Sequence, residues 1–156
     1  MIRTFAATTA LVLLLASCGS GPVRRVSEPA ASIQQLSVRA DGNWDVQLRL
    51  QNYSSVAMRF DKTSLEIAFD NGAAARLDVQ PNLDVGPESA DVYSATTIPL
   101  PSGRARIATA LADGRGLTYT LRGSVEATPQ GGKSKSWDIK RDSALSPVPG
   151  LPGALR

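Results

Sequence analysis

The chain of 156 residues contains no histidine and a single cysteine, Cys18. Without histidine it has no imidazole general base, no Ser-His-Asp triad and no imidazole metal ligand. One thiol also excludes an intrachain disulfide and zinc sites built from several thiolates. Basic residues are spread along the chain, unlike the clustered Lys/Arg of a nucleic-acid-binding surface. We therefore expect a protein that is not an enzyme, uses no metal or cofactor and binds no nucleic acid.

The N-terminal residues follow the order of a secretory signal. A short basic start with Arg3 precedes an apolar stretch over residues 5–16, and small residues follow it. As a helix this stretch would span about 18 Å, which is too short for a hydrocarbon core of about 30 Å. We therefore expect a cleaved signal and not a permanent transmembrane helix.

The tetrapeptide Leu15-Ala16-Ser17-Cys18 resembles the lipobox of bacterial lipoproteins. This resemblance implies that residues 1–17 are a signal peptide and that Cys18 carries the acyl chains that anchor the protein in a membrane. Gly19 follows the cysteine, and the absence of Asp at that place implies the outer membrane, with the folded part facing the periplasm. The alternative is an ordinary signal peptide that leaves Cys18 as a free thiol.

Composition divides the remaining chain into three parts. Residues 18–31 are rich in Ser, Gly and Pro, which predicts a flexible linker after the lipidated cysteine. Residues 32–142 carry the strand signals and are long enough to bury one core. The last residues, 143–156, contain several prolines and predict an irregular tail that forms neither sheet nor helix.

Apolar and polar residues alternate along several short segments, which is typical of half-buried strands. The clearest case is residues 44–51, where Trp44 and the following apolar residues alternate with polar ones. The predicted strands cover residues 32–39, 44–51, 65–69, 75–79, 90–98, 117–125 and the surroundings of Trp137. Six or seven such strands predict an all-β fold, a single antiparallel β-sandwich, with a half-open barrel as the alternative.

The segment 102–113 has a different spacing. Ile107 and Leu111 lie four residues apart, and Gly114 can end a helix after Asp113. We expect one short helix here, with a further strand as the alternative.

Two motifs suggest a family. Asn52-Tyr53-Ser54-Ser55 precedes a hydrophobic segment at 56–61, and Leu117–Val125 reads aliphatic-x-Tyr-x-aliphatic-x-Gly. Their order resembles the late-embryogenesis-abundant (LEA) type 2 proteins, also called water-stress-and-hypersensitive-response (WHy) domains, although Tyr53 stands where many members have Pro. The resemblance implies a sandwich of fibronectin type III or immunoglobulin-like character and a non-enzymatic role, such as protection during desiccation or osmotic stress. It brings no catalytic residues.

Three residues of these motifs are interpreted as structural. The short amide of Asn52 can hydrogen-bond the backbone where the chain leaves a strand. Tyr53 is expected to pack over the end of the sandwich, and Gly123 to permit a bulge or a close approach of a neighbouring strand. Trp44 and Trp137 fall on core-facing positions.

Two other functions remain open from the sequence. The protein could be an accessory or adaptor subunit of a cell-envelope complex, which binds an envelope protein through a strand edge or the Pro-rich tail. It could also bind a lipid or another apolar ligand between the sheets.

Overall fold

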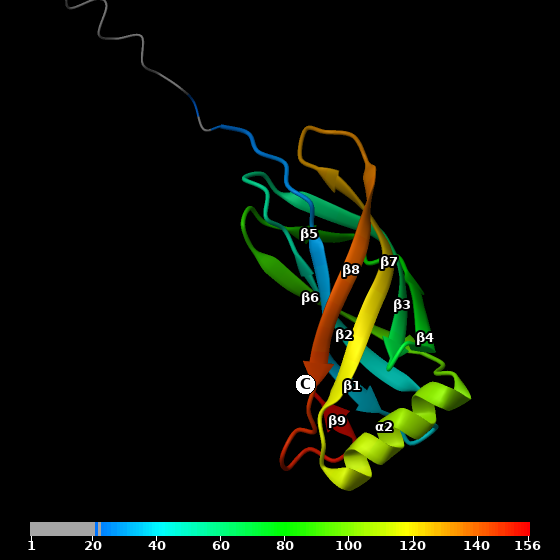
Figure 1. Cartoon of the computed structure of the whole chain (residues 1–156). Coiled ribbons are helices and arrows are strands. Elements are labelled where there is room, and N and C mark those ends of the chain that lie inside the picture. Colours follow the sequence, from blue (N-terminus) through cyan, green and yellow to red (C-terminus); the bar gives the residue numbers. More distant parts are fainter. Residues whose placement is uncertain (1–20, 22) are drawn as a thin grey trace, which may run out of the picture.

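The computed structural model describes Gly21 and residues 23–156, which form an antiparallel β-sandwich with one short helix (Figure 1). The predicted fold class and the predicted helix are both confirmed. Cys18 and the predicted signal peptide, residues 1–17, lie outside the described residues. In the part of the chain that is described, no helix is both long and apolar enough to cross a membrane.

The first sheet contains four strands in the order β6, β2, β1, β9. These are β6 (Ala90–Thr97), β2 (Trp44–Gln51), β1 (Ala30–Val38) and β9 (Ala154–Leu155). All neighbours are antiparallel.

The second sheet contains five strands and is likewise antiparallel. Its main path runs through β4 (Gly72–Val79), β3 (Met58–Phe69), β7 (Leu117–Pro129) and β8 (Lys135–Leu145). The short strand β5 (Leu83–Val85) pairs with the beginning of β3.

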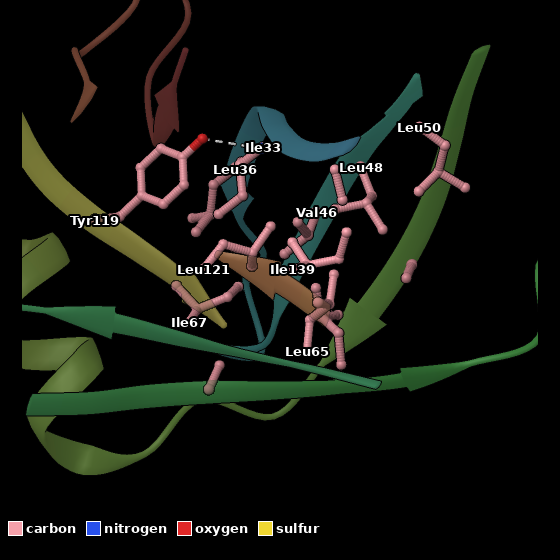
Figure 2. Close-up of a cluster of buried hydrophobic side chains, with 14 of the residues drawn as sticks. Ile33, Leu36, Val46, Leu48, Leu50, Leu65, Ile67, Tyr119, Leu121 and Ile139 are labelled. Atoms are coloured by element: carbon pink, nitrogen blue, oxygen red, sulfur yellow. Dashed lines mark hydrogen bonds between the residues drawn. The ribbon is translucent and has the colours of Figure 1, made fainter. Parts of the chain in front are cut away.

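The core lies between the two sheets and is built from the inward-facing residues of both (Figure 2). Trp44 and Trp137 are both buried, as their positions in the alternation predict. Tyr119 of β7 crosses the core, and its hydroxyl accepts a hydrogen bond from the Ile33 amide of β1 at 3.1 Å (Figure 2). Because each fully buried Leu or Ile side chain contributes about 1.5–3 kcal/mol, this core stabilises the domain without a disulfide.

Helix α2 (Pro101–Asp113) closes one end of the sandwich (Figure 1). Pro101 occupies the first helical position, where its missing N–H costs nothing. Gly114 ends the helix in the left-handed conformation, with φ +63°. Gly103 is buried against β4, and a Cβ added there would come within 2.6 Å of the Ala74 carbonyl oxygen. The helix therefore packs on β4 at a distance that only glycine permits.

The sheets extend beyond the limits that the sequence predicts. Residues 18–31 were expected to be linker, yet β1 begins at Ala30. The segment between Pro81 and Pro87, which lies outside the predicted strands, contains β5. Three-residue strands are too short to show an alternation, so β5 depends on its pairing with β3.

The tail expected to be irregular over residues 143–156 also takes part in sheet structure. Strand β8 continues to Leu145, and β9 pairs with β1 through Ala154 and Leu155. Ser146 and Arg156 exchange two backbone hydrogen bonds of 2.7 and 2.9 Å. The prolines do not prevent this pairing because the N–H groups it uses belong to other residues.

Candidate functional site

The Asn52 side chain joins two loops at the end of the sandwich opposite helix α2. It is fully buried, and its Nδ2 donates to the carbonyl oxygens of Val56, Val85 and Gly86 at 2.9, 3.3 and 2.8 Å. Its Oδ1 accepts a hydrogen bond from the Ser54 amide at 2.8 Å. Since the amide has two N–H groups, the longer contact to Val85 shares a proton with one of the others. Both ends of the side chain therefore hold backbone, the kind of contact expected of Asn52.

Backbone hydrogen bonds tie the same two loops together. The Asn52 amide donates to the Ser89 carbonyl at 2.8 Å, and the Glu88 amide donates to the Ser54 carbonyl at 3.0 Å. We call residues 52–56 and 85–89 the Asn52 cluster. Its loops follow β2 and β5, one strand from each sheet, so the cluster connects the two layers.

The chain before β1 is bound to this cluster. We call residues 23–29 the N-terminal arm. The Arg25 amide donates to Ser55 Oγ at 2.8 Å, and the Ser55 amide donates back to the Arg25 carbonyl at 3.0 Å. Further along, the Ser27 amide donates to Ser54 Oγ at 3.0 Å. The linker expected over residues 18–31 is thus held by hydrogen bonds within its second half, because Ser54 and Ser55 satisfy its backbone groups.

Two arginine side chains extend these contacts. The Arg25 guanidinium donates to the Tyr53 carbonyl at 3.1 Å and to Glu88 Oε1 at 2.7 Å. Arg24 donates to the Gln130 carbonyl at 2.8 Å, in the turn between β7 and β8. The Arg25–Glu88 ion pair is more than half exposed on both sides, so it adds little to stability. The backbone hydrogen bonds of the arm are the more important contacts.

Tyr53 differs from its expected placement. Its side chain was expected to pack over the end of the sandwich, but the residue is 52% exposed. The backbone on both sides is held by Asn52 and Ser54, and Arg25 binds the Tyr53 carbonyl. This arrangement leaves the ring facing solvent.

Gly123 lies in β7, opposite Leu65 of β3 and Ile139 of β8, and is not part of the Asn52 cluster. Its φ of +145° is a conformation that other residues rarely adopt. A Cβ added there would overlap the Ser64 carbonyl oxygen of β3. Of the two roles expected of Gly123, the structure therefore shows the close approach of a neighbouring strand. The register shift between β3 and β7 lies elsewhere, between Phe60 and Lys62.

The exposed carboxylates form surface contacts. Hydrogen bonds from Ser64 and then Arg76 lower the pKa of Asp78, and a hydrogen bond from Thr96 followed by the nearby Arg39 lowers the pKa of Asp45. Carboxylates held in their ionised form are poor general acids. Within residues 21 and 23–156, no group of three or more His, Cys, Asp or Glu residues is arranged to hold a metal ion.

Sequence reasoning missed the partners of the N-terminal arm. The motif analysis gave Ser54 and Ser55 no role of their own, and Arg25 falls in the predicted flexible linker. Their contacts join residues about 30 positions apart, for example Arg25 and Ser55. The adjacent serines after Asn52 are the one local signal, since their hydroxyls can bind free backbone groups.

Comparison with known proteins gives structural neighbours only. No family model matches the chain, and no curated protein matches it. A structural-genomics target solved by X-ray crystallography aligns with a TM-score of 0.50 at 11% identity, covering 81% of this chain and 92% of its own. A Bordetella pertussis protein provisionally named ApaA aligns at 0.48 and 13% identity, with 83% and 100% coverage. A protein provisionally assigned to the late embryogenesis abundant group aligns at 0.47 and 9% identity, with 97% and 85% coverage. The first of these likenesses shows a shared fold.

Proposed function

We propose that this protein is a lipid-anchored envelope protein whose non-enzymatic, LEA type 2-like sandwich protects the cell during desiccation or osmotic stress. The anchor would be the acylated Cys18, in the outer membrane, and the sandwich would face the periplasm. The observation that carries the proposal is the lipobox-like tetrapeptide Leu15–Cys18, which ends five residues before Val23, the first residue of an arm that is bound to the sandwich.

The arm gives the proposed anchor a defined geometry. Val23 is the fifth residue after Cys18, and its carbonyl accepts a hydrogen bond from Ser55 Oγ at 3.1 Å. Five residues span at most about 17 Å when fully extended. An anchor at Cys18 would therefore hold the Asn52 cluster near the membrane surface and direct helix α2 away from it.

The protective role is supported by the motifs at Asn52 and at Leu117–Val125, whose order resembles LEA type 2 proteins. The composition agrees with it, because the chain lacks histidine and has no second thiol for catalysis. The outer faces of the strands carry charged and hydroxyl side chains, which hold a layer of water on the surface.

The anchor is tested by Cys18→Ser in the cell of origin. We expect the unchanged protein to partition into the detergent phase as a processed, acylated form. The variant should remain unprocessed and incorporate no labelled fatty acid. Equal labelling of the two proteins would contradict the proposed anchor.

The protective role is tested by deletion of the gene. Survival after drying, osmotic shock and freezing should fall and should be restored by the unchanged gene. If a gene encoding Cys18→Ser also restores survival, protection does not require the anchor. Unchanged survival of the deletion strain in all three stresses would contradict the protective role.

A further inference from the structure

An apolar groove lies between helix α2 and the β1–β2 hairpin. Helix α2 lies at the end of the sandwich opposite the N-terminal arm (Figure 1). One face of the helix supplies Arg104, Ile107, Ala108 and Leu111, which are spaced at i, i+3, i+4 and i+7. The hairpin supplies Val38, Gly42 and Trp44. The walls are apolar, and the groove has a volume of about 250 Å³.

The groove is pre-formed because its walls are fixed by the fold. Trp44 and Ile107 are each 1% exposed and belong to the main core. The start of the helix is bound to β4 by the Leu100 amide, which donates to the Ala74 carbonyl at 2.8 Å, and by Ser102 Oγ, which donates to the Ala73 carbonyl at 2.9 Å. The groove therefore needs no rearrangement to exist.

A cation stands at the edge of this groove. The Arg104 guanidinium reaches from α2 to Gly42, where an added Cβ would lie 3.6 Å from Nη1. Among the described residues no carboxylate lies within salt-bridge distance of Arg104, whereas the neighbouring Arg106 pairs with Asp70 at 3.1 Å.

The two carboxylates of the hairpin, Asp41 and Asp45, have partners of their own. Asp41 and Asp45 both pair with Arg39, at 3.6 and 3.3 Å. Thr96 also donates a hydrogen bond to Asp45 at 2.7 Å. The charge of Arg104 is thus left for a ligand.

We infer that this groove binds a medium-chain fatty acid, with the alkyl chain against Val38, Ala108 and Leu111 and the carboxylate on Arg104. Apolar walls with one uncompensated cation at the edge are complementary to an anionic amphiphile. A cavity of about 150 Å³ holds benzene, so a groove of about 250 Å³ has room for an alkyl chain. This site goes beyond the proposed protective function and does not depend on the anchor.

The test uses the full chain with labelled methyl groups in phosphatidylcholine nanodiscs, titrated with sodium decanoate. We expect saturable chemical-shift changes at Ile107 and Leu111, with the methyl groups of Ile67 unchanged as an internal control. Arg104→Gln should weaken binding about fivefold, because a partly exposed charge contact is lost. Arg106→Gln, two residues along the same helix, should leave the affinity unchanged.

Two further measurements separate specific binding in the groove from other effects. Ala108→Leu should fill the groove and abolish the shifts without unfolding the helix, since leucine is a good helix former. Decan-1-ol should bind more weakly than decanoate, and equal affinity would contradict the role of Arg104. Absence of saturable shifts with decanoate, or methyl shifts that depend on protein concentration and indicate a second copy in the groove, would overturn the inference.

Discussion

Asn52→Ala should remove much of the stability of the sandwich. The native side chain is fully buried. Its two N–H groups and its oxygen form hydrogen bonds with four backbone groups. Each hydrogen bond contributes a net of about 1 kcal/mol, so three fully used groups correspond to about 3 kcal/mol. For a domain of this size the loss lowers the melting temperature by about 10 °C.

The assay is urea unfolding followed by circular dichroism, together with amide hydrogen exchange of the folded protein. Asn52→Asp keeps the shape of the side chain but presents oxygen to the carbonyls of Val56 and Gly86, so it should destabilise at least as much as Asn52→Ala. The control is Asn43→Ala in the β1–β2 turn, where the side chain bonds the exposed Asp41 at 3.1 Å and should contribute less than about 1 kcal/mol.

Hydrogen exchange locates the effect. The Ser54 amide donates to Asn52 Oδ1, so its exchange should accelerate in both Asn52 variants. A change of less than about 1 kcal/mol for Asn52→Ala, with unchanged protection of the Ser54 amide, would refute the reasoning.

Four other substitutions test three separate features. Gly123→Ala should prevent folding or cost more than about 3 kcal/mol, because the added Cβ overlaps the Ser64 carbonyl and the backbone has a positive φ. Gly114→Ala, also at positive φ but with no atom within 4 Å of the added Cβ, should cost only about 1–2 kcal/mol, and equal urea midpoints for the two variants would contradict this account. Thr63→Val should stabilise the protein by about 1 kcal/mol in the same measurement, because the buried Thr63 hydroxyl has no hydrogen-bond partner among the described residues; a destabilised variant would show that the hydroxyl is satisfied. The pKa of Asp78 lies below its ordinary value of 3.8, so its stabilising contribution is present above that pH and is lost as the pH falls through the lower, folded value. Ser64→Ala should raise that pKa in a carboxyl NMR titration, and an unchanged titration would contradict the role of the hydroxyl.

Local patterns predict the strands that have an uninterrupted alternation. Strand β2 runs over Trp44–Gln51, the range its alternation indicates. Helix α2 is similarly readable, because the spacing of Ile107 and Leu111 and the end signal at Gly114 are properties of the segment itself. Such elements can be read because burial of one face imposes a period of two or 3.6 residues.

Strand β3 shows where the local pattern fails. It begins at Met58, seven residues before the predicted start at Leu65. The register shift between Phe60 and Lys62 changes the phase of the alternation, so the buried positions pass from Met58 and Phe60 to Thr63 and Leu65. An extra residue in one strand is accommodated only because β7 is present as its partner.

The sequence by itself determines the all-β class, the helix and the use of Asn52 as a residue whose amide binds backbone. The tertiary structure decides what that amide binds, since the carbonyls of Val85 and Gly86 come from a loop more than 30 residues later. It also decides that Ser54 and Ser55 hold the N-terminal arm, and that Arg104 lies beside an apolar groove with no carboxylate partner in the part of the chain that the structure describes. The alternation of buried and exposed residues is a property of each short segment and can be predicted from that segment alone. Contacts between distant segments depend on how the two sheets meet, and no local window of the chain contains that information.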